Sequence, residues 1–134
     1  MNAKAFFDTN IIVYAFSSND PRGEKAEALL AQGGIISVQV LNEFVNVSRR
    51  KRLRDWDEIQ DALAVLRTLL DVPQPLTIEV HEAAIAIARD YRFAFYDSLI
   101  VASAMRAGCA VLYSEDFQHE QRVKDLTIRN PFVR

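Results

Sequence analysis

The stretch AKAFFDTNII (residues 3–12) decides the fold, because an apolar run stops there at a carboxylate and a helical pattern follows at once. Residues 3–7 are short and apolar, which is typical of a buried strand. Thr9 or Asn10 lies near the expected cap of a short helix over residues 10–16. A strand that passes directly into a helix favours an α/β fold.

The rest of the chain repeats this alternation. Further helices are expected over residues 24–32, 38–50, 79–92 and 97–107, and a capping box at 55–58 opens another that runs to about residue 70. Short strands are expected at 35–37, 76–78 and 110–113, with an edge strand at 127–128. Such an alternation implies a parallel sheet covered on both faces.

Composition limits the possible classes of protein. The 134 residues predict one domain covering 1–134, and half of them are apolar, which is enough for one core. The net charge of −2 provides no general attraction to polyanions, so a polyanionic partner must be held locally. Cys109 is the single cysteine, and we expect it to be a small buried hydrophobe. We see neither a signal peptide nor a membrane span and expect a cytoplasmic protein.

Four acidic residues occupy places where a domain of this size usually has apolar or small ones. Asp8 and Asp116 follow expected strands, Asp97 opens a helix, and Glu43 lies on the apolar face of the helix over residues 38–50. Ligands of open parallel sheets bind beyond the carboxyl ends of the strands. We therefore expect the four carboxylates to converge at one edge of the sheet.

A cluster of carboxylates suits Mg²⁺ or Mn²⁺, which prefer hard oxygen ligands and leave positions for water and phosphate oxygens. Each acid also has a purely structural interpretation. Asp8 and Asp97 could cap the helices that they precede, and Asp116 could be an ordinary loop residue. Glu43 is harder to explain in this way, because its helical phase places it among apolar residues.

Four segments resemble the successive acidic motifs of PIN-domain nucleases, and they occur in the family's order over nearly the whole chain. These segments are Phe7 to Ile11, Asn42 to Glu43, Tyr96 to Ile100 and Tyr113 to Asp116. The size of the chain makes it most similar to VapC-type toxins of bacterial toxin–antitoxin pairs. The resemblance implies a three-layer α/β/α sandwich with a central parallel sheet, and a metal-dependent endoribonuclease that is neutralised by a cognate antitoxin and is typically a homodimer.

The resemblance also implies roles for individual residues. Asp8 and Asp97 would be the primary ligands of Mg²⁺ or Mn²⁺, Asp116 would complete the metal site, and Glu43 would hold a water or a second ion. Neighbouring polar contacts would come from Thr9, Asn10 and Ser114. Many members of the family have another acid at the position of Gln118, and this departure makes the second ion less certain.

A basic run, Arg49 to Arg54, is the densest positive cluster of the chain. Arg49 and Arg50 are candidates for binding the phosphates of an RNA substrate. Equally, the run could be a solvated helix end whose cations complement the helix dipole. Tyr96 could stack a base, but core packing is the favoured interpretation.

Three other functions remain open from the sequence. The chain could be a PIN-like nuclease outside a toxin–antitoxin pair, or a PIN-like module that only binds. It could also be a phosphatase or phosphotransferase that uses Asp8 as an aspartyl nucleophile. Enzymes of that last kind usually have a second Asp two residues later, and Asn10 occupies that place here.

Overall fold

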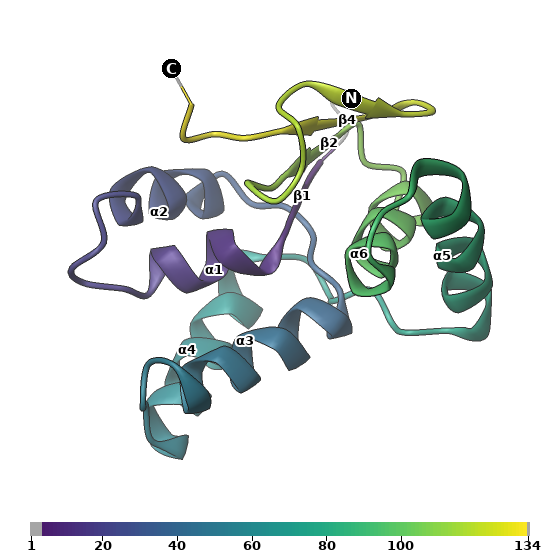
Figure 1. Ribbon diagram of the computed structural model, residues 1–134. Helices are drawn as coiled ribbons and strands as arrows, with labels where there is room; N and C mark the ends of the chain where they lie inside the picture. Colours follow the sequence, from purple (N-terminus) through teal and green to yellow (C-terminus); the bar gives the residue numbers. More distant parts are fainter. Residues whose placement is uncertain (1–3, 134) are drawn as a thin grey trace.

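The computed structural model describes residues 4–133 and contains one mostly parallel sheet (Figure 1). Its strands are β1 (Ala5–Phe7), β2 (Val111–Tyr113), β3 (Gln121–Val123) and β4 (Leu126–Arg129), in the order β1-β2-β4-β3. β1 pairs with β2 and β2 with β4 in parallel, whereas β3 runs antiparallel to β4. The expected central parallel sheet is therefore confirmed, with one antiparallel strand added at its edge.

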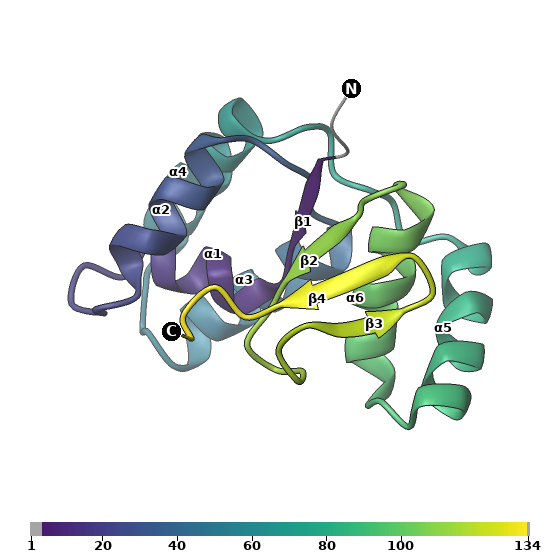
Figure 2. The same ribbon diagram turned by 90° about the horizontal axis from the view of Figure 1, so that it is seen from above.

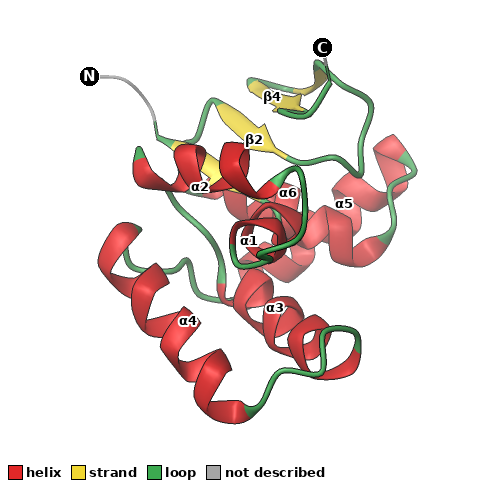
Figure 3. Cartoon of the chain, turned by 90° about the vertical axis from the view of Figure 1, so that its left-hand side faces the viewer, coloured by secondary structure: helices red, strands yellow, loops and turns green. Residues whose placement is uncertain are grey.

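Six helices surround the sheet. They are α1 (Thr9–Ala15), α2 (Gly23–Ala31), α3 (Val38–Arg50), α4 (Trp56–Leu69), α5 (Ile78–Tyr91) and α6 (Phe95–Arg106). α1 and α2 lie on one side of the strands and α5 and α6 on the other, which is the expected α/β/α arrangement (Figures 1 and 2). α3 and α4 form a neighbouring pair beyond the carboxyl end of β1, and α3 packs against α1 (Figure 3).

Local capping explains where several helices begin. The Ser37 hydroxyl accepts a hydrogen bond from Val40 N at the start of α3. The capping box before α4 is confirmed, because Asp55 and Glu58 each accept from the other's backbone amide. Each such cap satisfies amides that the first turn leaves without partners and typically stabilises a helix by about 1 kcal/mol.

Two of the expected strands are not regular strands. Residues 35–37 make only isolated bridges, from Ile35 to Phe6 and from Ser37 to Gln74. The expectation for residues 76–78 was wrong, because the Thr77 hydroxyl accepts from Val80 N and caps α5, which begins at Ile78. A cap three residues before its amide partner outweighs the strand propensity of such a short apolar segment.

The end of the sheet also differs from the expectation. β4 lies between β2 and β3, so it is an interior strand and the segment 127–128 does not form the edge. The true edge is β3, which joins β4 through a tight turn where Lys124 has a positive φ of 54°. A residue other than glycine in that conformation gives no turn signal in the sequence, so the hairpin was missed.

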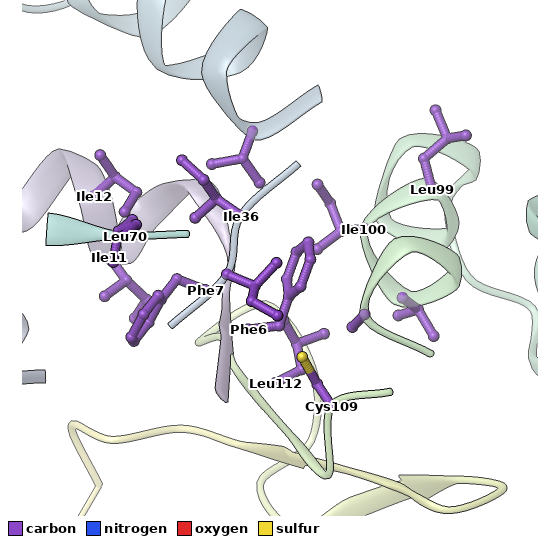
Figure 4. Close-up of a cluster of buried hydrophobic side chains, with 14 of the residues drawn as sticks. Phe6, Phe7, Ile11, Ile12, Ile36, Leu70, Leu99, Ile100, Cys109 and Leu112 are labelled. Carbon is purple, nitrogen blue, oxygen red and sulfur yellow. The ribbon is translucent and has the colours of Figure 1, made fainter. Parts of the chain in front are cut away.

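A single core fills the space between the sheet and the helices. Phe6, Ile12, Ile100 and Leu112 are all fully buried in it (Figure 4). Gly34 lets the segment after α2 cross β1, since a Cβ there would lie 2.5 Å from the Phe7 ring and 2.7 Å from Ala5 O. Cys109 is buried as expected, and burial raises the pKa of its thiol to about 11.

Across residues 4–133, every helix is too short or too polar to cross a lipid bilayer.

Candidate active site

The carboxyl ends of β1 and β2 bring two of the four acids to the same edge of the sheet. Asp8 follows β1 directly, and its backbone amide donates to Tyr113 O, the last carbonyl of β2, at 2.9 Å. Asp116 lies three residues beyond Tyr113. Glu43 comes from the middle of α3, and Asp97 from the first turn of α6. The four acids therefore reach this edge from four different elements.

Asp8 is the most buried of the four, with 3% of its surface exposed. Its Oδ1 accepts from Thr9 N at 2.7 Å, and its Oδ2 accepts from the Ser114 hydroxyl at 2.6 Å. Burial raises the pKa of Asp8 to about 7; the two hydrogen bonds oppose this, and the negative charges of Asp116 and Asp97 add to it. Asp8 itself is the N-cap of α1, so the expectation that Thr9 or Asn10 caps this helix was wrong.

Glu43 is held by two neutral side chains. Thr9 Oγ1 donates to Glu43 Oε1 at 2.5 Å, and Gln39 Nε2 donates to Oε2 at 3.1 Å. Both carboxylate oxygens therefore have a donor, although no cation is among these partners. Gln39 was missed in the sequence, yet its spacing of four residues before Glu43 on a helix is the signal that could have revealed it.

Asp116 is oriented by its neighbours in the loop after β2. Asn10 Nδ2 lies 3.3 Å from each carboxylate oxygen of Asp116. The backbone amide of Asp116 donates to the Ser114 hydroxyl at 3.1 Å. Burial raises the pKa of Asp116, and the charges of Glu115 and Glu43 raise it further. The same Ser114 hydroxyl thus contacts both Asp8 and the backbone of Asp116.

Asp97 lies in the first turn of α6 but does not cap it, because the helix begins at Phe95 after an Ala94 cap that has no side-chain bond. Within residues 4–133, no hydrogen bond to the Asp97 carboxylate acts on its pKa. Burial raises its pKa, followed by the charges of Asp116 and Glu43. The capping explanation for Asp97 therefore does not apply.

The charges that act on the pKa values of Asp8, Asp97 and Asp116 are all negative. As the side chains are placed, no three His, Cys, Asp or Glu residues within 4–133 are grouped closely enough to enclose an ion. The donor set itself fits a hard divalent cation, because it consists of carboxylates that repel one another and are surrounded by neutral hydroxyls and amides.

The remaining candidate residues have diverse surroundings. Arg49 and Arg50 are both exposed. The Arg49 guanidinium lies 4.6 Å from the Trp56 ring centre and donates to Arg54 O. Tyr96 is 64% exposed, so the expectation that it packs in the core was wrong. Gln118, at the family's additional acidic position, is exposed.

A second acidic cluster lies next to the first and was missed in the sequence. Arg22 pairs with Asp20 at 2.9 Å and with Glu115 at 3.2 Å, and its guanidinium lies 3.7 Å from the ring centre of Tyr14. The Tyr14 hydroxyl in turn donates to Glu115. Partners that lie 93 residues apart give no local pattern that a reader of the sequence could use.

Comparisons with known proteins agree with the fold. The model of the PIN domain family matches residues 5–124. The fold is similar to VapC20 of Mycobacterium tuberculosis, a Sarcin-Ricin loop cleaving toxin, at 23% identity over 84% of this chain and 89% of that chain, with a TM-score of 0.65.

Two further solved structures are similar over almost their whole length. One is a toxin–antitoxin complex from Klebsiella pneumoniae, at 20% identity over 96% of this chain and 98% of that chain, with a TM-score of 0.72. The other is VapBC2 of Rickettsia felis bound to a DNA fragment from its promoter, at 21% identity over 94% of this chain and 97% of that chain, with a TM-score of 0.69. No curated protein sequence matches the chain significantly.

Proposed function

The chain belongs to the PIN domain family, and from that premise we propose that it is a metal-dependent endoribonuclease and the toxin of a type II toxin–antitoxin pair. The observation that carries this proposal is the group of four carboxylates, three of which have a raised pKa under exclusively negative neighbouring charges. Carboxylates whose pKa is raised and that have no neighbouring cation are typical of functional sites.

Asp8, Asp97 and Asp116 would hold the ion, with Glu43 beside them. A bound Mg²⁺ or Mn²⁺ supplies Lewis-acid chemistry, which makes water more acidic and offsets the negative charge of the phosphate oxygens. The chain's own part is orientation. Thr9 N and the Ser114 hydroxyl fix both oxygens of Asp8, and the Thr9 hydroxyl fixes Glu43.

The alternative in which Asp8 attacks phosphate as a nucleophile is disfavoured by these contacts. Both oxygens of Asp8 already accept hydrogen bonds, and only 3% of the residue is exposed. In-line attack on phosphorus needs open space around the attacking oxygen, whereas a metal ligand needs only one remaining lone pair directed at the ion. The surroundings of Asp8 therefore suit a fixed ligand better than an attacking group.

Assignment as a toxin adds the partners: an RNA substrate, a cognate antitoxin and a second copy of the chain, in the cytoplasm. The similar structures include a Sarcin-Ricin loop cleaving toxin and a toxin–antitoxin complex. α4 and the residues that flank it expose Leu53, Trp56, Val65, Leu69 and Val72. Exposed apolar side chains gathered on one element are typical of a protein–protein interface.

The activity is tested by incubating the purified chain with total bacterial RNA in Mn²⁺ and mapping the new 5′ ends. We expect discrete cleavage that stops in excess EDTA and falls at least 100-fold in Asp8→Asn. The mutant should keep the circular dichroism spectrum of the wild type. Cleavage that survives both EDTA and Asp8→Asn would contradict the metal-dependent mechanism.

The assignment as a toxin is tested separately by inducing the chain in growing bacteria. We expect growth arrest with the wild type and none with Asp8→Asn. Arrest should be relieved by co-expression of the small reading frame next to the gene, if that frame encodes a DNA-binding N-terminus. An active nuclease that leaves growth unaffected would place the chain outside toxin–antitoxin pairs.

A further inference from the structure

Two hollows adjoin along one face of α3 and share Asn46. The first, about 450 Å³, is lined by Gln39, Asn42, Glu43, Asn46 and Tyr96. The second, about 230 Å³, is lined by Asn46, Val47, Arg50 and Lys51. Positions 39, 43, 46 and 50 recur every three or four residues, so they form a single stripe along the helix. We call the two hollows together the α3 groove.

The charge of the α3 groove changes sign along its length. One end contains Glu43 and also Tyr96, the residue immediately before Asp97. The other end contains Arg50 and Lys51. Seven residues separate Glu43 from Arg50, which is about 10 Å along the helix axis. This length corresponds to about two or three nucleotides at 3.4 Å or more for each.

The wall of the groove carries groups that recognise single-stranded nucleic acid. Tyr96 is 64% exposed, and its ring contacts Phe95 edge-on, with the ring centres 6.0 Å apart. An exposed aromatic face of this kind can stack a base. Asn42 and Asn46 are exposed and offer amide donors and acceptors between the aromatic ring and the cations.

The basic run divides into two groups in the structure. Arg49 is engaged with Trp56 and Arg54 O, and Arg54 donates to Phe16 O, so these two arginines hold the loop after α3 in place. Arg50 and Lys51 line the groove. The phosphate-binding interpretation of the run therefore applies to Arg50 and Lys51, and Arg49 has a structural role.

We infer that the α3 groove binds a single strand of RNA as it leaves the acidic site, with a base on Tyr96 and a phosphate on Arg50 and Lys51. The inference rests on the proposed function, because that function places the scissile phosphate at the carboxylates. A protein partner fits the groove less well. Its lining is polar and amide-rich except for Tyr96, whereas several exposed apolar side chains lie on α4 and the residues that flank it.

Binding is measured by fluorescence anisotropy with a labelled 12-nucleotide RNA pool of random sequence, in the non-cleaving Asp8→Asn background. We expect Arg50→Ala/Lys51→Ala to weaken binding about 10-fold at low salt. The slope of log K against log salt should shrink by about 0.7, because the variant loses one phosphate contact and each such contact on a single strand contributes about 0.7. The matched control, Arg67→Ala/Arg106→Ala, removes two exposed cations from α4 and α6 and should bind like its parent.

The stacking surface is tested in the same assay with two substitutions of Tyr96. Tyr96→Ala should weaken binding about 10-fold without changing the salt slope, whereas Tyr96→Phe should bind like the parent. Exchanging the cations, Arg50→Lys/Lys51→Arg, should also preserve binding. Loss of affinity in either conservative variant would contradict the stacking and charge assignments.

The outcomes separate this inference from the proposed function. Suppose that the wild type cleaves RNA in Mn²⁺ but Arg50→Ala/Lys51→Ala binds RNA as tightly as the control Arg67→Ala/Arg106→Ala. Then the α3 groove does not bind the RNA, and the nuclease assignment stands. If the groove variants lose binding but no RNA is cleaved by the wild type, the proposed function fails and the groove remains. If polyglutamate of equal charge displaces the RNA, and Tyr96→Ala leaves the RNA affinity unchanged, the groove would instead be assigned to an acidic peptide.

Discussion

Two clusters of carboxylates meet at the carboxyl end of β2, and they differ in whether a cation neutralises their negative charge. Glu115 and Asp20 share the guanidinium of Arg22, which lies 3.2 Å and 2.9 Å from them. Asp116 is the next residue after Glu115. Within residues 4–133 its carboxylate accepts from the neutral Asn10 amide, and its backbone amide donates to the Ser114 hydroxyl. Adjacent residues of one loop thus enter opposite electrostatic environments.

The pKa values follow this difference. Hydrogen bonds from Arg22 lower the pKa of Asp20 to about 2. In the other cluster, burial and neighbouring negative charges raise the pKa values of Asp8, Asp97 and Asp116. Asp20 and Glu115 have the cation of Arg22 beside them, whereas no cation acts on the pKa values of Asp8, Asp97 and Asp116. This second cluster is therefore the candidate for binding a metal.

The largest expected effect contrasts catalysis in the two clusters. We predict that Asp97→Asn lowers kcat/KM for RNA cleavage at least 100-fold, which exceeds the 10- to 100-fold loss typical of a residue that only supports a ligand. Glu115→Gln, in the compensated cluster, should stay within about 10-fold of the wild type. Equal losses in the two variants would show that compensation does not distinguish the functional acids.

The second effect concerns stability without metal. The pKa of Asp8 is about 7 in the folded chain and 3.8 when unfolded. Between these values only the folded state holds the proton, so the free energy of unfolding falls as the pH rises, and the loss is complete above pH 7. The difference corresponds to about 4 kcal/mol.

Asp8→Asn removes the free-energy cost of ionising a buried carboxyl group, and it keeps a carbonyl oxygen that can accept from Thr9 N. In EDTA we therefore expect the mutant to be more stable than the wild type by about 4 kcal/mol at pH 8, with the gap closing toward pH 4. Urea unfolding across this pH range measures it. A mutant that is less stable at pH 8 would mean that Asp8 is a structural cap whose charge the fold needs.

Local signals explain what the sequence predicted well. The capping box at Asp55 and Glu58 and the apolar phase of α3 involve residues three or four apart, so they are visible in any window of the chain. The four acids were found because carboxylates are unusual beside apolar runs. Their placement next to β1, β2, α3 and α6 follows from the strand–helix alternation, and their roles as metal ligands remain predictions.

Contacts between distant residues explain what could not be predicted. The pair Arg22–Glu115 joins residues 93 apart, and β3 exists only because it pairs with β4. The exposure of Tyr96 depends on how α6 sits against α3. Such features arise from tertiary packing, which overrides the weak propensities of short segments.

A third, smaller effect tests the compensated cluster. Arg22→Met should keep much of the stem's packing on Tyr14 but leave Glu115 and Asp20 without their cation. We expect a loss of about 1–2 kcal/mol in the free energy of unfolding, since the guanidinium is partly exposed and solvent screens it. Adding Glu115→Gln should restore part of the loss. Strictly additive losses would show that the Arg22–Glu115 pair is not coupled.

The smallest effect separates the two causes that act within the uncompensated cluster. Asp97 is partly exposed, so Asp97→Asn in EDTA at pH 8 should stabilise the chain by less than about 1 kcal/mol, by removing first the cost of partial burial and then the repulsion from Asp116 and Glu43. In 1 M NaCl, where the Debye length falls to about 3 Å, the part of this gain that comes from repulsion should disappear. The gain from Asp8→Asn should persist in the same salt, because burial is its first cause and only 3% of Asp8 is exposed. If salt abolished both gains equally, mutual repulsion alone would account for the cluster, and Asp8 would not be set apart by its burial.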